Sequence, residues 1–137
     1  MKGIADTGFL VAFLNRRDRY FPWAYAVAET IREPLLTCEA VLAEASYHLR
    51  NSSAVLQLTE KGLVRLGFDL SQNQVEVAAL ADRYADREPD LADLCLIRMS
   101  ELNPALSIVT VDCEFQIYRR NRHQVIPVVM PGGKHGT

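Results

Sequence analysis

The sequence predicts a single α/β domain in which helices cover both faces of a mainly parallel sheet. The length of 137 residues is in the commonest range for one domain with its own core. Hydrophobic residues make up 49% of the chain and charged residues 23%, as in ordinary globular proteins. Short apolar runs alternate with segments of helical periodicity, a pattern typical of parallel sheets buried on both faces.

The first third of the chain alternates strand and helix. Residues 3–5 form a short apolar run, and the pattern predicts a helix over residues 7–14, followed by a charged turn at 15–18. Pro22 suits the first position of a second helix. Residues 35–38 are apolar and bounded by Pro34 and Glu39, so they are predicted to form a second buried strand.

In the middle of the chain we expect a helix over residues 39–50. Ser53 resembles the N-cap of another helix that ends near Gly67, and residues 68–70 fit a third strand. Ser71 can cap the next helix. Apolar residues then recur at helical spacing at Val77, Leu80, Ala81 and Tyr84.

The last third contributes a helix and two more strands. A polar stretch at residues 86–89 precedes a predicted helix over 90–102. Residues 107–111 are predicted to form a fourth strand, and residues 125–129 a fifth that Pro127 confines to an edge. We expect one domain over residues 1–130 and a loose tail over 131–137, where Pro and Gly cluster.

Composition also limits the cellular compartment and the class of binding partner that we expect for this protein. The three cysteines, Cys38, Cys95 and Cys113, are odd in number and form no CxxC pair, so we expect free thiols. No apolar run reaches the roughly 18 residues that span a bilayer, and the amino terminus lacks a signal-peptide pattern. We therefore expect a cytoplasmic protein without membrane contact. A net charge of −2 argues against a uniformly basic surface but leaves local basic patches open.

Four carboxylates fall at related places on this map. Asp6 closes the first strand, Asp112 closes the fourth, Asp93 opens a helix, and Glu44 lies in the helix after the second strand. Ligands of open α/β sheets bind at the carboxyl ends of the strands, so these residues can share one pocket. We identify Asp6, Glu44, Asp93 and Asp112 as the candidate catalytic residues.

Each carboxylate also has a simpler structural interpretation. Asp90 and Asp93 stand three apart at a helix start, where a capping aspartate and a first-turn acid are both favoured. Asp6 and Asp112 can cap the elements that follow them, and Glu44 can lie on a solvated face. Strand-terminal acids beside apolar runs lie near the core, however, where unpaired charge is costly. A cation would stabilise such a cluster.

The chemistry that suits this cluster is phosphodiester hydrolysis with Mg²⁺ or Mn²⁺, hard cations that prefer oxygen ligands. It needs no nucleophilic triad, and the sequence offers no convincing one. His48 lies one helical turn after Glu44, so a metal or outer-shell role is conceivable. A partly exposed packing histidine is the preferred interpretation.

Four motifs together resemble those of the PIN-domain nucleases. They are ADTGFL at residues 5–10, AEA at 43–45, PDLADL at 89–94 and TVDCEF at 110–115. The sequence looks particularly like the toxin component of VapBC-type toxin–antitoxin modules, and the resemblance extends from residue 2 to residue 129. It implies a three-layer α/β/α sandwich with a central, mainly parallel sheet of about five strands.

The resemblance also implies an activity and a site. The family's activity is that of a Mg²⁺- or Mn²⁺-dependent endoribonuclease that leaves a 5′-phosphate and a 3′-hydroxyl. The acids already identified match the family's acidic positions, with Asp6, Asp93 and Asp112 as metal ligands. Candidate outer-shell residues are Thr7, Asp90 and Glu114.

Partners are implied by the resemblance as well: an RNA substrate, a cognate antitoxin protein and a second copy of the chain in a homodimer. Phe21, Trp23 and Tyr25 can supply an aromatic interface, with core packing an equal or better explanation for Trp23. The candidate RNA-binding residues are basic side chains that follow the first helix and the Asp112 motif, with solvated surface as the simpler interpretation of each. They are Arg16, Arg17 and Arg19, and Arg119, Arg120 and Arg122.

Three other functions are alternatives to the ribonuclease interpretation. A PIN-like binding or scaffold module would retain the acids only as helix caps. A phosphoryl-accepting domain would use a lysine after a later strand, but the chain has none between Lys61 and Lys134. A phosphatase of the haloacid-dehalogenase type would carry Asp-x-Asp after the first strand, where Gly8 stands instead.

Overall fold

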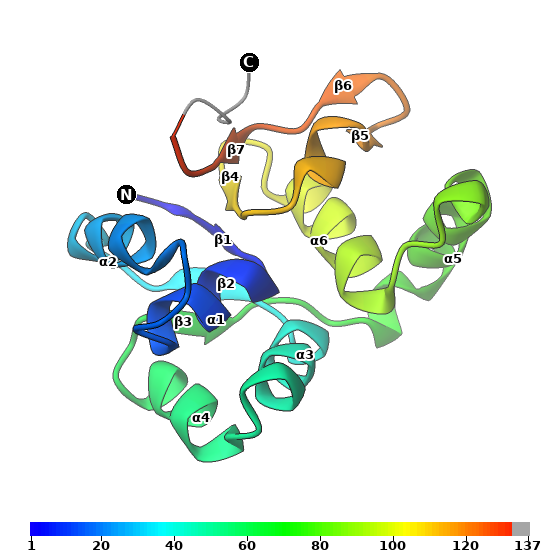
Figure 1. The fold of residues 1–137 in the computed structure, drawn as a ribbon. Coiled ribbons are helices and arrows are strands. Elements are labelled where there is room, and N and C mark those ends of the chain that lie inside the picture. The colour runs from blue at the N-terminus through cyan, green and yellow to red at the C-terminus, as the bar shows by residue number, and fades with distance from the viewer. Residues whose placement is uncertain (133–137) are drawn as a thin grey trace.

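The computed structural model describes residues 1–132 and has an α/β fold built on a parallel sheet (Figure 1). The five strands of the sheet lie in the order β3-β2-β1-β4-β7, and every pairing in it is parallel. Their bounds are β1 Gly3–Ala5, β2 Leu35–Thr37, β3 Val64–Leu66, β4 Ser107–Val109 and β7 Val128–Val129. The predicted fold class is confirmed. Residues 133–137 of the expected tail lie outside the described residues.

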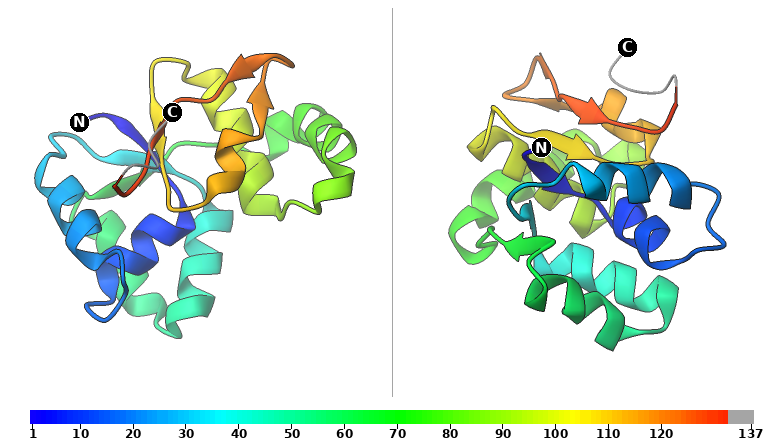
Figure 2. Two further views of the ribbon diagram at one scale, coloured as in Figure 1. Left: turned by 45° about the horizontal axis from the view of Figure 1, so that its top comes forward. Right: turned by 90° about the vertical axis from the view of Figure 1, so that its left-hand side faces the viewer.

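Helices flank this sheet on both sides, which gives the three-layer sandwich (Figures 1 and 2). Their bounds are α1 Thr7–Leu14, α2 Phe21–Glu29, α3 Glu39–Leu49, α4 Ser52–Glu60, α5 Gln74–Arg83 and α6 Leu91–Leu102. Helix α6 packs against β1 and β4, and α5 packs on α6. Among residues 1–132, no helix is long and apolar enough to cross a membrane.

The core forms where the apolar strands meet α6. Ile4, at the centre of β1, pairs with Leu36 of β2 on one side and with Ile108 of β4 on the other. Ile4 and Ile108 are fully buried, as are Leu96 and Ile97 of α6. Because both faces of these strands are covered, their sequences are uninterrupted apolar runs rather than alternating ones.

Strand β1 is the point where the strand order reverses. The chain runs from β1 outward through β2 to β3, and then returns to the other side of β1 to form β4. In open α/β sheets the carboxyl ends of the strands at such a switch point leave a crevice. The fold therefore places Asp6, after β1, beside the segment that follows β4.

The middle of the chain corrects three predictions: the cap of one helix, the end of that helix and the position of the third strand. Helix α4 is capped by Asn51, whose Oδ1 accepts from the backbone N of Ala54 at 3.0 Å, and not by Ser53. The helix ends at Glu60, and the third strand is Val64–Leu66 rather than residues 68–70. Gly62 has φ +80°, a left-handed conformation that turns the chain directly into β3.

The predicted fifth strand is divided in the structure. Pro127 separates β6, Gln124–Val125, from β7. Strand β6 pairs with β5, Arg119–Arg120, in a small antiparallel sheet that the sequence did not predict. Strand β7 lies at the edge of the main sheet, as expected, and the carbonyl of Pro127 accepts from the Ile108 backbone N at 2.9 Å.

Arg120 belongs to the fold and not to an exposed basic patch. It is buried, and its guanidinium donates to the carbonyls of Ser100 and Pro104, both at 3.1 Å, and to Ser100 Oγ at 2.9 Å. These bonds fix the carboxyl end of α6 to the segment before β4. The expectation that Arg120 binds RNA is therefore corrected, because its donors are already used inside the protein.

We predict that Arg120→Met lowers the free energy of unfolding by about 2–4 kcal/mol, because buried acceptors lose a charged donor. Arg122→Met, at a neighbouring exposed position, should change it by less than about 0.5 kcal/mol. Urea unfolding of the two variants provides the comparison. Equal effects would contradict the structural role of Arg120.

Candidate active site

A pocket of about 430 Å³ opens at the carboxyl edge of the sheet. Helices α1, α3 and α6 and the segment after β4 supply its walls. The lining residues are Asp6, Thr7, Gly8, Val11, Glu44, His48, Asp90, Asp93, Val111 and Asp112. The structure thus brings all four candidate catalytic carboxylates into one pocket, which we call the acidic pocket.

Asp6 is held rigidly at the base of the acidic pocket. Only 4% of its surface is exposed. Its Oδ1 accepts from the backbone N of Thr7 at 2.6 Å, and its Oδ2 accepts from Thr110 Oγ1 at 2.5 Å. The carboxylate therefore both caps α1 and faces the end of β4.

Thr110 supports two of the candidate site residues, and the sequence did not indicate this role. It is fully buried, and its Oγ1 donates to Asp6 and accepts from the backbone N of Asp112 at 2.9 Å. One hydroxyl thus links the ends of β1 and β4. The available signal was a lone hydroxyl residue at the end of an apolar strand, two positions before Asp112.

Asp112 also combines two roles. Its Oδ1 accepts from the backbone N of Glu114 at 2.9 Å, which caps the short 3₁₀ helix η3, Cys113–Gln116. Asp112 still lines the acidic pocket, and its charge contributes to raising the pKa of Asp6 and of Asp93.

Asp90 fits the helix-capping interpretation, whereas Asp93 fits the interpretation as a site residue. Asp90 is the N-cap of α6, since its Oδ1 accepts from the Asp93 backbone N at 2.8 Å. The Asp90 N–H makes a weak reciprocal contact with the Asp93 carboxylate that lowers the pKa of Asp93. Burial and, next in size, the charges of the neighbouring acids raise the pKa of Asp93 by more than this contact lowers it. Asp93 therefore gains little from its helical position.

The electrostatics of the acidic pocket disfavour charge on its carboxylates. Burial, with a contribution from Asp112 and Glu44, raises the pKa of Asp6 from 3.8 to about 7. Burial, followed by the charges of Asp90, Asp6 and Asp112, raises the pKa of Asp93 to about 8. Burial also raises the pKa of Glu44. A cation in the acidic pocket would reverse these shifts.

The donor set suits a hard divalent cation. It consists of carboxylate oxygens, which Mg²⁺ and Mn²⁺ prefer. Thr7 Oγ1 is buried beside the carboxyl of Glu44 and has no partner at hydrogen-bonding geometry, so it is free to bind a ligand. Among residues 1–132, however, no three His, Cys, Asp or Glu side chains are already close enough to enclose a metal ion.

The remaining acidic and histidine candidates differ in whether they line the acidic pocket. Asp90 and Thr7 line the acidic pocket, whereas Glu114 is absent from its lining and forms an ion pair with Arg87 at 3.1 Å. His48 is exposed, as expected, and contacts the Tyr47 ring edge-on, but it also lines the acidic pocket.

The candidate RNA-binding arginines do not form one group. Arg16 and Arg17 are exposed just after α1. Arg119 is partly buried, and its Nη1 donates to the carbonyls of Gln116, Ile117 and Tyr118. Arg122 is exposed in the turn between β5 and β6.

The aromatic candidates for a partner interface also differ. Trp23 packs edge-on against the fully buried Phe9, with ring centroids 5.9 Å apart, so its role is core packing. Tyr25 is 51% exposed and lies against Phe21 at 5.9 Å. Of the three aromatic residues, Tyr25 is the one exposed to solvent.

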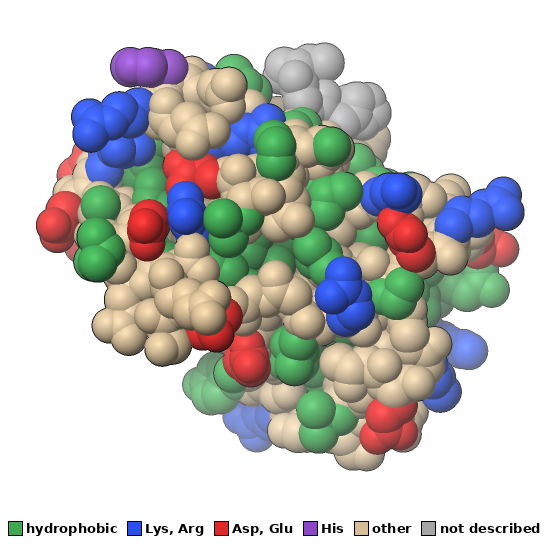
Figure 3. Space-filling model, turned by 180° about the vertical axis from the view of Figure 1, so that it is seen from behind, with side chains coloured by type: hydrophobic (Ala, Val, Ile, Leu, Met, Phe, Trp, Pro, Cys, Tyr) green, Lys and Arg blue, Asp and Glu red, His purple; other side chains and the backbone are tan. Residues whose placement is uncertain are grey.

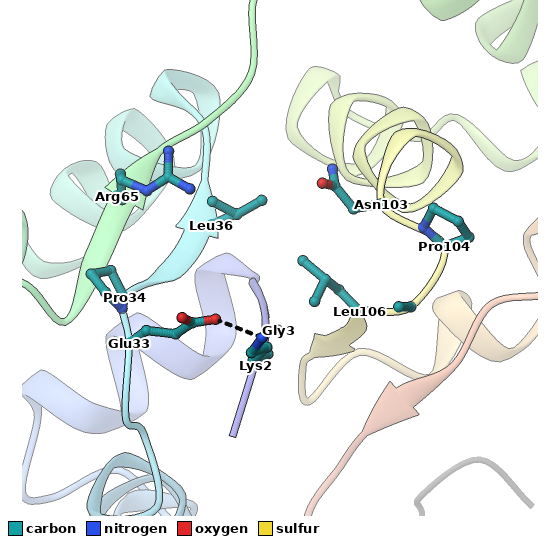
Figure 4. A pocket seen from close by; sticks show the side chains of 10 residues that line it. Lys2, Gly3, Glu33, Pro34, Leu36, Arg65, Asn103, Pro104 and Leu106 are labelled. Carbon is teal, nitrogen blue, oxygen red and sulfur yellow. Dashed lines mark ion pairs between the residues drawn. The ribbon is translucent and has the colours of Figure 1, made fainter.

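A second cavity, of about 410 Å³, lies at the amino edge of the sheet (Figure 4). Its polar lining includes Lys2, Glu33 and Arg65, and Lys2 pairs with Glu33 at 3.5 Å. Because Glu33 is the one carboxylate in this lining, the cavity has no carboxylate cluster. The face seen from behind carries hydrophobic side chains near its centre, with acidic and basic ones interspersed around them (Figure 3).

No family model and no curated protein matches this chain. What the protein does is therefore inferred from the acidic pocket and from the sequence motifs.

We predict that the metal-free protein loses stability as the pH rises from about 4 to about 8. The folded state holds protons on Asp6 and Asp93 that the unfolded chain releases near its ordinary pKa of 3.8, so folding favours low pH across this window. Excess Mn²⁺ should flatten the dependence. Thermal melts at a series of pH values, with and without Mn²⁺, test this; rising metal-free stability across the window would contradict it.

Asp93→Asn should leave metal-free stability at pH 8 level or raise it by about 1 kcal/mol, roughly 2–6 °C in Tm, because one of several neighbouring charges is removed. The same change should shrink the stabilisation by Mn²⁺. A first-turn carboxylate without a site role predicts the opposite, a loss of about 0.3–1 kcal/mol and an unchanged Mn²⁺ effect. Differential scanning calorimetry distinguishes the two.

Proposed function

We propose that this protein is a metal-dependent endoribonuclease that hydrolyses RNA phosphodiester bonds. The observation that supports this most strongly is the acidic pocket, in which Asp6, Glu44, Asp93 and Asp112 come together from four separate segments. Gathering several carboxylates around one buried carboxylate is unfavourable for folding, so it is typical of functional sites.

In this proposal the oxygens of Asp6, Asp93 and Asp112 hold Mg²⁺ or Mn²⁺. When bound, the cation lowers the pKa of a water molecule and neutralises charge on the phosphate. Asp6 is fixed by Thr7 and Thr110, so its carboxylate meets the ligand without reorganising.

Glu44 is the proposed proton acceptor for the attacking water. It lines the acidic pocket from α3, whereas Asp6 and Asp112 follow strands β1 and β4. Burial raises the pKa of Glu44 above its ordinary value, which makes this carboxylate a stronger base. Attack of that water on phosphorus would leave a 5′-phosphate and a 3′-hydroxyl.

An anionic substrate needs positive charge outside the acidic pocket, because the carboxylates of the pocket repel phosphate. Arg16 and Arg17 are exposed directly after α1, the helix that Asp6 caps. We assign them to the RNA backbone. The choice of RNA rests on the resemblance to PIN-domain nucleases.

The same resemblance supports a biological role as the toxin of a toxin–antitoxin module, with a cognate antitoxin as protein partner and a homodimer as the assembly. The exposed Tyr25 side chain suits such an interface.

A binding or scaffold module is the second candidate. It is favoured by the capping roles of Asp6, Asp90 and Asp112, and by the lack of a preformed three-residue metal group among residues 1–132. Such a module would bind RNA or protein without cleaving RNA.

We predict that the purified full chain cleaves single-stranded RNA internally with Mn²⁺ and that EDTA stops the cleavage. Glu44→Gln should lower kcat by about 100-fold or more, since it removes the proposed proton acceptor. Glu114→Gln, outside the acidic pocket, is the matched control and should stay close to wild type.

Gel assays of end-labelled RNA provide the measurement. Undiminished cleavage in excess EDTA would contradict the metal mechanism, and RNA binding without cleavage in Mn²⁺ would favour the binding module.

A further inference from the structure

A second hollow adjoins the acidic pocket. It has a volume of about 330 Å³ and lies where the end of α1 meets the junction of α3 and α4. Its lining residues are Leu14, Asn15, His48, Leu49, Asn51 and Ala54, and we call it the side pocket. His48 lines both hollows, so the side pocket adjoins the acidic pocket at this residue.

Two amide side chains give the side pocket its polar character. Asn15 Oδ1 accepts from the Arg17 backbone N, and Asn51 Oδ1 accepts from the Ala54 backbone N, both at 3.0 Å. These bonds fix both side chains. Neither Nδ2 group has a hydrogen-bond partner within residues 1–132, so each remains a free, oriented donor.

The rest of the lining combines three apolar side chains with His48. Leu14, Leu49 and Ala54 supply apolar surface, and no lysine, arginine or carboxylate lines the side pocket. A phosphate group would meet neither a lysine nor an arginine here. A flat ring with apolar faces and carbonyl oxygens at its edge would match both the apolar surface and the two amide donors.

We propose that the side pocket binds one unpaired base of the RNA, from the nucleotide next to the phosphate in the acidic pocket. The base is one with a ring carbonyl, namely uracil, cytosine or guanine, because a carbonyl oxygen has two lone pairs and can accept from both amides, whereas each ring-nitrogen acceptor of adenine has one. This inference rests on the proposed ribonuclease function and adds base selectivity to it.

Asn51→Asp tests the proposal without disturbing the fold. Aspartate caps a helix as well as asparagine does, so the bond to the Ala54 N–H is retained. The substitution replaces the Nδ2 donor with a carboxylate oxygen, which repels a base carbonyl. Asn51→Ser keeps a capping oxygen and removes the donor without adding charge. Gln72→Glu, at an exposed site outside both hollows, controls for added charge.

The experiment measures kcat/KM with Mn²⁺ on oligouridylate, oligoadenylate and bis(p-nitrophenyl) phosphate, a diester without a base. The wild type should prefer oligouridylate over oligoadenylate by about tenfold, the size expected for one or two hydrogen bonds. Asn51→Asp and Asn51→Ser should abolish that preference, mainly through KM, and leave diester hydrolysis within about twofold of wild type, as should Gln72→Glu.

Each other outcome has a definite meaning. An unchanged base preference in both Asn51 variants, or no preference in the wild type, would overturn the base-binding proposal while leaving the nuclease intact. Equal losses on the diester and on RNA would also overturn it, because Asn51 would then act on the acidic pocket. A wild type inactive on all three substrates would overturn the nuclease function and this proposal with it.

Discussion

The hydrogen bond from Thr110 Oγ1 to Asp6 Oδ2 joins the ends of two neighbouring parallel strands, from positions 104 residues apart in the chain. The same hydroxyl accepts from the Asp112 backbone N, so one threonine sets the spacing between the two strand-end acids. Asp6 is the N-cap of α1 and Asp112 is the N-cap of η3, so both elements start next to this contact. Glu44 and Asp93 then complete the acidic pocket from α3 and α6.

This arrangement makes capping and site formation compatible. Asp6, Asp90 and Asp112 each accept a backbone N–H and also line the acidic pocket. Their capping bonds orient the carboxylates and offset part of the cost of gathering like charges. For Asp93 this compensation is too small. Burial raises its pKa to about 8, and the hydrogen bond from the first turn of its helix lowers the pKa by less than burial raises it.

Charged residues that look similar in the sequence have different uses in the fold. Arg120 and Arg122 are two positions apart, yet one ties down the end of α6 and the other is exposed. Glu114 follows Asp112 by two positions but pairs with Arg87 outside the acidic pocket. In the two proposals, the side pocket would select a base and the acidic pocket would carry out the reaction.

The sequence by itself determined the fold class, the start of most helices and strands, and the four acids that share the acidic pocket. Apolar runs and caps such as Asp6 and Asp90 act locally, so they can be read without knowing what they pack against. Tertiary structure alone decided the early turn at Gly62, the division of the last strand at Pro127, the contacts of Thr110 and Arg120, and the position of Asn15 and Asn51 around one hollow. Each of these depends on partners far away in the chain or on the space between helices, and linear periodicity carries no information about either.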